Sequence, residues 1–168
     1  SSFWLNLQAN YDAELLMLDE EDSIEEEERS VYVKMKEIVD YCAERYITVI
    51  PEFDVPGHTS AILHAYPQLS CTGEAIEVKT SQGIYADILC AGKDETFDVV
   101  FDILSEMLEI FPSEYIHIGG DEAPKTRWKE CPRCQERMRK EGLKDEETLQ
   151  GWFTNKIVEF LEANGRKA

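Results

Sequence analysis

The sequence has little positive charge: 17 lysines and arginines stand against 35 aspartates and glutamates, for a formal net charge of −18 over 168 residues. Nucleic acid and anionic membrane surfaces would both repel such a chain, so the charge argues against both as partners. The sequence also lacks any apolar run approaching the roughly 18 residues of a membrane span. No basic leader precedes Phe3–Leu5, so we expect no signal peptide in this chain. A composition that is 43% hydrophobic and 31% charged is that of a globular domain.

The cysteines are few and odd in number, five in all. Cys131 and Cys134 form half of a zinc-ribbon pattern, but Cys71 and Cys90 do not supply a second CxxC, so the sequence predicts no metal site. Cys71 and Cys90 could instead form a disulfide that closes the loop between them, if the protein is exported. Cys42 lies on the apolar face of an expected helix and is predicted to be a buried thiol.

Two short apolar runs, each preceded by an amphipathic helix, organise most of the chain. The runs at residues 47–50 and 115–118 are typical of strands buried on both faces of a parallel sheet. Apolar side chains recur at helical spacing in four other segments. We expect helices at residues 31–46, 94–111, 126–141 and 145–163. The order of helices and strands predicts an α/β fold built from right-handed units.

Residues 1–30 differ in character from the rest of the chain. Residues 1–18 read as a helix, and residues 19–28 hold eight acids in ten positions. Such a block repels itself and is typical of a solvated linker or a frayed helix. We therefore predict two parts: a helical leader with an acidic linker at residues 1–30, and an α/β segment at residues 31–168.

Polar clusters follow the ends of both expected strands. The first comprises Glu52, Asp54 and His58, and the second His117, Asp121 and Glu122. If the strands are parallel neighbours, both clusters lie on the edge of the sheet where ligands bind. Gly119 and Gly120 would let a ligand approach the backbone closely. Two carboxyl groups in different surroundings can divide the roles of proton donor and charged partner, which is what glycoside cleavage needs.

Simpler interpretations of the same residues stay open at this point. A Gly-Gly-Asp-Glu turn is commonly the start of a helix with an acidic cap. Glu52 and Asp54 could be surface acids, and His58 or His117 an ordinary hydrogen-bonded histidine. Trp128 is expected in the core rather than on a sugar-binding surface.

The stretch His117-Ile-Gly-Gly-Asp-Glu122 resembles the His-x-Gly-Gly-Asp-Glu signature of glycoside hydrolase family 20, the β-N-acetylhexosaminidases. Pro51-Glu-Phe-Asp-Val-Pro-Gly-His58 resembles a second signature of that family, in the same order along the chain. The resemblance covers about residues 31–160, and the stretch from Lys125 to Cys134 looks like the bacterial branch. It implies a (β/α)8 TIM barrel, of which this chain is an incomplete segment, and a periplasmic or secreted bacterial location.

The activity implied by the resemblance is hydrolysis of glycans that end in N-acetylglucosamine or N-acetylgalactosamine, with no metal or cofactor. In the substrate-assisted mechanism, the acetamido oxygen of the sugar attacks the anomeric carbon, so the enzyme supplies no nucleophile. By matching positions, Glu122 would be the general acid/base, Asp121 would orient the acetamido group, and His58 would support Glu122. The residues that would line the rim, binding substrate or supporting these groups, are Glu52, Asp54 and His117.

The resemblance also shows what this sequence is missing. The family carries a sugar-gripping arginine on its first strand and an aspartate on its second, and neither is found upstream of Val31. Residues 1–30 instead resemble the tail of helix-turn-helix antitoxin proteins. We therefore expect little or no activity from the isolated chain, because orientation of the substrate needs the missing walls. Uncovered barrel edges would favour self-association, and a noncatalytic scaffold that binds a partner is the alternative function.

Overall fold

The computed structural model of the chain describes residues 20–81 and 83–168, with side chains described from residue 31 onward. The helix expected at residues 1–18 lies outside these residues. From Glu20 the chain forms α2 (Glu20–Ala43), so most of the acidic block belongs to one helix with the apolar positions that follow it. The division into two parts at residue 30 stays a prediction.

Six further helices, of 3 to 18 residues, follow α2 in the described chain. They are α3 (Ser60–Ala65), the 3-10 helix η1 (Pro67–Leu69), α4 (Asp94–Ile110), α5 (Thr126–Glu130), α6 (Pro132–Glu141) and α7 (Glu146–Ala163). The helix expected at residues 126–141 is thus two helices, because Pro132 cannot continue a helix but is well suited to start one. None of the described helices combines the length and apolar character needed to cross a bilayer.

Helix α7 begins with a reciprocal cap. The Asp145 carboxylate accepts a hydrogen bond from the Thr148 backbone N–H at 2.8 Å, and the Thr148 hydroxyl bonds back to the Asp145 backbone. The bond from the Thr148 N–H lowers the pKa of Asp145 below its ordinary value. The helix start predicted near residue 145 is therefore confirmed, with its physical cause.

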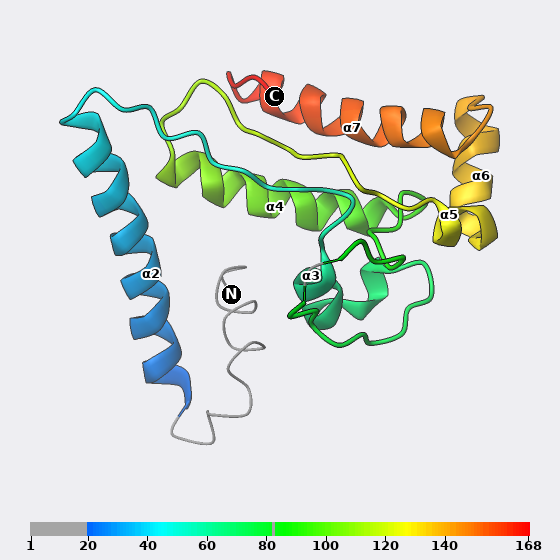
Figure 1. Cartoon of the computed structure of the whole chain (residues 1–168), viewed down its shortest axis with the longest axis horizontal. Helices are drawn as coiled ribbons and strands as arrows, with labels where there is room; N and C mark the ends of the chain where they lie inside the picture. The colour runs from blue at the N-terminus through cyan, green and yellow to red at the C-terminus, as the bar shows by residue number, and fades with distance from the viewer. Residues whose placement is uncertain (1–19, 82) are drawn as a thin grey trace.

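Two extended segments run side by side in the same direction across the layer formed by α4 and α7 (Figure 1). The His117 N–H donates to the Pro51 carbonyl at 2.9 Å, and the Phe53 N–H donates to the His117 carbonyl at 2.8 Å. On its other edge the second segment pairs with the C-terminal end, where the Ile116 N–H donates to the Lys167 carbonyl at 2.9 Å. The parallel arrangement of the two segments that the sequence predicted is confirmed.

The burial predicted for the two strands is wrong in part. Ile47 and Ile50 are 55% and 52% exposed, and Tyr115 is 46% exposed. Burial on both faces requires neighbouring strands at each edge and a cover on each face. Within the described residues, pairing with the second segment begins only at Pro51. Residues 47–50 are extended, and three of the four are exposed.

The core joins the extended pair and helices α4 to α7 to α3, η1 and the loop before α4. Phe97 of α4 contacts the rings of Trp152 and Phe153 of α7, with centroids 5.4 and 5.0 Å apart. Trp128 of α5 is fully buried, as expected from the sequence, and its indole Nε1–H donates to the Leu89 carbonyl at 2.9 Å. This bond joins α5 to the long loop that precedes α4.

We expect Trp128→Phe to destabilise the fold by about 2–4 kcal/mol, because it leaves the buried Leu89 carbonyl without a donor and opens a cavity beside it. Urea unfolding followed by fluorescence or circular dichroism would measure the loss. Trp152→Phe is the matched control, since this tryptophan is only half-buried at the surface of the core. An equal loss of stability in both variants would contradict the role assigned to the Trp128 N–H.

Candidate active site

The two polar clusters meet at one edge of the extended pair. Nε2 of His58 lies 3.1 Å from Oε2 of Glu122, although the two residues are 64 positions apart in the chain. Beside this pair, Glu52 and His117 face each other in a parallel bridge, with Nδ1 of the histidine 3.4 Å from Oε1 of the glutamate. The structure therefore brings the two clusters together and places His58 beside Glu122, as the motifs predicted. The pairing of Glu52 with His117 is an addition from the structure.

Asp54 fastens the turn that carries the second cluster. Its Oδ1 accepts a hydrogen bond from the Gly120 N–H at 3.0 Å. Gly119 has a φ of +61°, and a Cβ on it would lie 1.9 Å from the same Asp54 oxygen. The position thus requires glycine both for its backbone conformation and for the close approach of Asp54. Asp54 is half-buried in this contact and is not a free surface acid.

His58 and Glu122 share an unusual backbone conformation. Their φ angles are +54° and +46°, a region that costs residues with a side chain roughly 1–2 kcal/mol. Such strain persists only where surrounding structure fixes it, and it is concentrated at functional sites. The loop of His58 packs on the other turn, since a Cβ on Gly57 would lie 3.4 Å from the carbonyl oxygens of Asp121 and Glu122.

The carboxyl groups of the second cluster are accessible to a ligand. The side chains of His58 and Glu122 are 35% and 49% exposed, and Asp121 is exposed on the same turn. Together these groups can hold a proton on Glu122, support it from His58 and present a second carboxylate to a bound molecule. This arrangement fits acid/base chemistry better than the simple helix cap, because residues 119–125 form no helix.

An open hollow of about 500 Å³ lies beside Glu122. Its far wall is α7, which sequence reasoning did not include in the site. Gln150 donates its side-chain N–H to the Gly120 carbonyl, and Nζ of Lys125 lies 3.5 Å from Oε2 of Glu147. The signal was present in the sequence, because the lining positions 147, 150, 151 and 154 share one face of a helix by their spacing.

The loop before α4 contacts both sides of this site. The Leu89 N–H donates to the Pro56 carbonyl at 3.0 Å, next to the His58 loop, while its carbonyl accepts the Trp128 indole N–H. Two residues earlier, Asp87 accepts a hydrogen bond from Arg127 at 2.8 Å. That bond raises the pKa of Arg127 above its ordinary value. The loop at residues 87–89 therefore links the first motif to α5.

Four cysteines gather where α5 ends and α6 begins, and sequence reasoning missed this cluster. The sulfur atoms of Cys71, Cys90, Cys131 and Cys134 all lie within 4.8 Å of one another, and every cysteine of the chain is a free thiol. The disulfide considered between Cys71 and Cys90 is thus not formed. Hydrogen bonds to Cys134 and then Cys71 lower the pKa of Cys90 to about 3. Cys42 is half-buried rather than buried.

Residues 12–168 match the profile described as Glycosyl hydrolase family 20, catalytic domain. A β-hexosaminidase of Porphyromonas gingivalis is 46% identical over 134 residues, which make up 80% of this chain and 17% of that protein. A solved β-N-acetylhexosaminidase from Bacteroides fragilis superposes with a TM-score of 0.75 and 46% identity, covering 82% of this chain and 26% of its own.

A more distant structure shares the fold of this segment. The exo-β-N-acetylglucosaminidase from Vibrio harveyi, solved in complex with N-acetylglucosamine, superposes with a TM-score of 0.69 and 29% identity over 80% of this chain and 21% of its own. The chain spans less than a third of the length of the curated relatives that it matches, from 17% of the Porphyromonas gingivalis protein to 30% of a β-hexosaminidase from Akkermansia muciniphila.

Proposed function

Because this chain belongs to glycosyl hydrolase family 20, we propose that it carries the acid/base edge of an enzyme that hydrolyses terminal, non-reducing N-acetylhexosamine residues. One observation carries the proposal: the 3.1 Å contact between His58 and Glu122, beside the exposed Asp121. A general acid must reach the glycosidic oxygen while its own partner holds it in place. Glu122 is half-exposed at the edge of the hollow and meets both requirements.

In the proposed reaction, Glu122 gives its proton to the leaving oxygen as the acetamido oxygen of the sugar attacks the anomeric carbon. Asp121 orients the acetamido group and stabilises the positive charge of the cyclised intermediate. Glu122, now a carboxylate, takes a proton from the water that opens this intermediate, so the anomeric configuration is retained. His58 acts through Glu122 and is a positioning residue.

The rim residues have supporting roles in this proposal. Asp54 fixes the glycine turn through the Gly120 N–H, and Glu52 and His117 pair at the edge of the two segments. The substrates would be glycans that end in N-acetylglucosamine or N-acetylgalactosamine. A periplasmic or secreted bacterial location fits such substrates and the bacterial relatives, and fractionation of the producing cell would test it.

Binding of an intermediate analogue tests the site even where turnover is slow. A thiazoline derivative of N-acetylglucosamine mimics the cyclised intermediate, and we expect it to bind about 10²-fold or more tightly than the sugar itself. Asp121→Asn should remove most of this difference, because the charge that stabilises the intermediate is lost. Titration calorimetry measures both affinities, with Asp102→Asn on the exposed face of α4 as the control. Equal affinity for the analogue and the sugar in the unaltered chain would contradict the proposal.

A noncatalytic role as a self-associating scaffold is favoured by one apolar surface. Ile38, Ile47 and Ile50 are 57%, 55% and 52% exposed. A hollow of about 300 Å³ near them is lined by Met35 and Phe111. Exposed apolar surface of this kind marks interfaces between proteins. Under this alternative we propose that a second copy of the chain covers it.

Light scattering across a range of concentrations tests that alternative. We expect Ile38→Glu to shift the chain toward the monomer, since a charge on this surface opposes apolar contact. Ile84→Glu is the matched control, because Ile84 is equally exposed, at 55%, on a loop elsewhere in the molecule. A chain that stays monomeric at every concentration would rule the scaffold out.

A further inference from the structure

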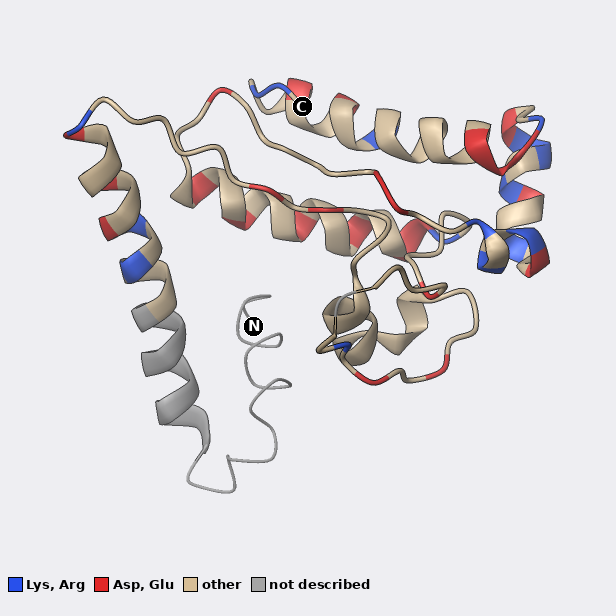
Figure 2. Ribbon diagram, in the orientation of Figure 1, with Lys and Arg blue, Asp and Glu red and all other residues tan. Residues whose placement is uncertain are grey.

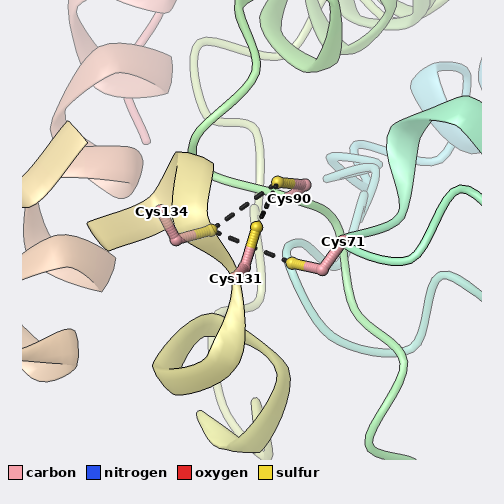
Figure 3. A group of neighbouring side chains, drawn as sticks. All are labelled: Cys71, Cys90, Cys131 and Cys134. Atoms are coloured by element: carbon pink, nitrogen blue, oxygen red, sulfur yellow. Dashed lines mark hydrogen bonds between the residues drawn. The ribbon is translucent and has the colours of Figure 1, made fainter. Parts of the chain in front are cut away.

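The four clustered sulfur atoms have the spacing of a tetrahedral metal site. The Sγ atoms of Cys71 and Cys134 are 3.8 Å apart, those of Cys90 and Cys131 also 3.8 Å, and those of Cys90 and Cys134 3.6 Å. Zinc bound by four thiolates at ~2.3 Å places neighbouring sulfurs ~3.8 Å apart. Figure 3 shows the four side chains turned toward one another. We propose that these cysteines bind one zinc ion, at a site separate from the proposed sugar-cleaving edge.

Disulfides explain the spacing less well than a shared metal ion. The bonded sulfurs of a disulfide lie ~2.05 Å apart, far closer than any of these pairs. Moreover, Cys90 lies within 3.8 Å of both Cys131 and Cys134, and Cys134 is equally near Cys71. A common centre requires such multiple neighbours, whereas two disulfides would require two separate pairs.

Local structure explains how distant cysteines reach one centre. Cys131 is the N-cap of α6 and Cys134 lies in its first turn, so the CxxC pair points its sulfurs to the same side. Gly92 lets the loop of Cys90 approach, because a Cβ there would lie 2.3 Å from the Arg133 carbonyl carbon. Cys71 is brought in by the preceding loop, where the Cys90 N–H donates to the Leu69 carbonyl at 2.9 Å.

The surroundings suit a negatively charged centre. Zinc with four thiolates carries a net charge of about −2, which must be compensated where the sulfurs are buried. Cys90 and Cys134 are 0% exposed. Lys93 is buried nearby, and it lines with Arg133 a hollow that reaches Cys71. Figure 2 shows basic residues concentrated on α5 and α6, in a chain whose net charge is −18.

The ion would stabilise a part of the fold that has little regular structure of its own. Between Ser70 and Lys93 the described residues form no helix, and a single isolated bridge joins Ser70 to Leu89. Zinc would tie this loop to α6, and Leu89 in turn contacts the Pro56 loop and Trp128. The proposed role is therefore structural: metal binding adds directly to the free energy of folding.

Metal analysis of the purified full chain is the first test. We expect about one zinc per chain by mass spectrometry of the metal, with four sulfur neighbours at ~2.3 Å by X-ray absorption. Exchange for Co²⁺ should produce the charge-transfer absorption of tetrahedral cobalt thiolate. The proposal is overturned if iron replaces zinc at that stoichiometry, if no metal is bound, or if the intact mass is lower by the hydrogens lost in two disulfides.

Substitutions then assign the ligands. Cys90→Ser should lose nearly all bound zinc and unfold at a lower temperature, whereas Cys42→Ser should keep both the metal and the melting temperature. Cys42 is the matched control because it is the one cysteine outside the cluster. Should Cys90→Ser fail to fold, chelation of zinc from the unaltered chain gives the same comparison. Unchanged zinc content in Cys90→Ser, or an unchanged melting temperature after zinc is removed, would refute the structural role.

Discussion

Replacement of Glu122 by glutamine should lower kcat/KM for an N-acetylglucosamine disaccharide about 10²–10⁴-fold, the usual contribution of a positioned general acid. Glutamine keeps the length of the side chain and its ability to bond with His58, but it has no acidic proton to give to the leaving oxygen. A coupled assay that converts released N-acetylglucosamine into a fluorescent signal can detect slow turnover by the isolated chain at high protein concentration. Glu109→Gln on the exposed face of α4 is the control.

Comparing substrates with two different leaving groups distinguishes a general acid from a residue that only binds substrate. A nitrophenolate leaves without much help from a proton, whereas a sugar alkoxide needs one. Because kcat/KM reports the step in which the glycosidic bond breaks, we expect the Glu122→Gln loss to be much smaller for the nitrophenyl substrate. Asp121→Asn should reduce both rates similarly, since charge on the cyclised intermediate develops with either substrate. Equal losses for both substrates in Glu122→Gln would show that Glu122 is not the acid.

The meeting of His58 and Glu122 could be predicted because it depends on short-range patterns. Each follows an apolar run that ends in a polar turn, and two parallel runs bring their ends to the same edge. The same reasoning failed for Ile47 and Ile50. Their apolar character indicated a strand, but exposure depends on which neighbours cover it, and local sequence does not contain that information.

The cysteine cluster could not be predicted for a related reason. Cys131 and Cys134 lie three residues apart, the CxxC spacing at which two cysteines can bind the same metal ion. Cys71 and Cys90 lie on an irregular loop whose path is fixed by tertiary hydrogen bonds, such as that from the Trp128 indole to Leu89. Periodicity carries no signal for such a path. Pro132, in contrast, is a local signal for the break between α5 and α6, which the single helix predicted at residues 126–141 missed.

Gly119→Ala should destabilise the chain by about 3–5 kcal/mol, because strain and a lost hydrogen bond act together. The new Cβ would lie 1.9 Å from Oδ1 of Asp54, so that carboxylate must leave the Gly120 N–H. Gly142→Ala isolates the strain, since Gly142 has a similar φ of +66° and nothing within 4 Å of the added carbon. Urea unfolding should show a loss of only about 1–2 kcal/mol for that control.

A double-mutant cycle identifies the source of the larger loss. In an Asp54→Ala background the carboxylate is already absent, so adding Gly119→Ala should cost less than it does in the unaltered chain. It should still cost more than Gly142→Ala, because the new Cβ would lie 2.8 Å from the Asp54 Cα, which alanine keeps. The binding of the thiazoline analogue should fall in Gly119→Ala and in Asp54→Ala alike, because both release the turn that presents Asp121. If Gly119→Ala costs the same free energy with and without the Asp54 carboxylate, this contact does not hold the turn. Backbone conformation alone would then fix the position of Asp121.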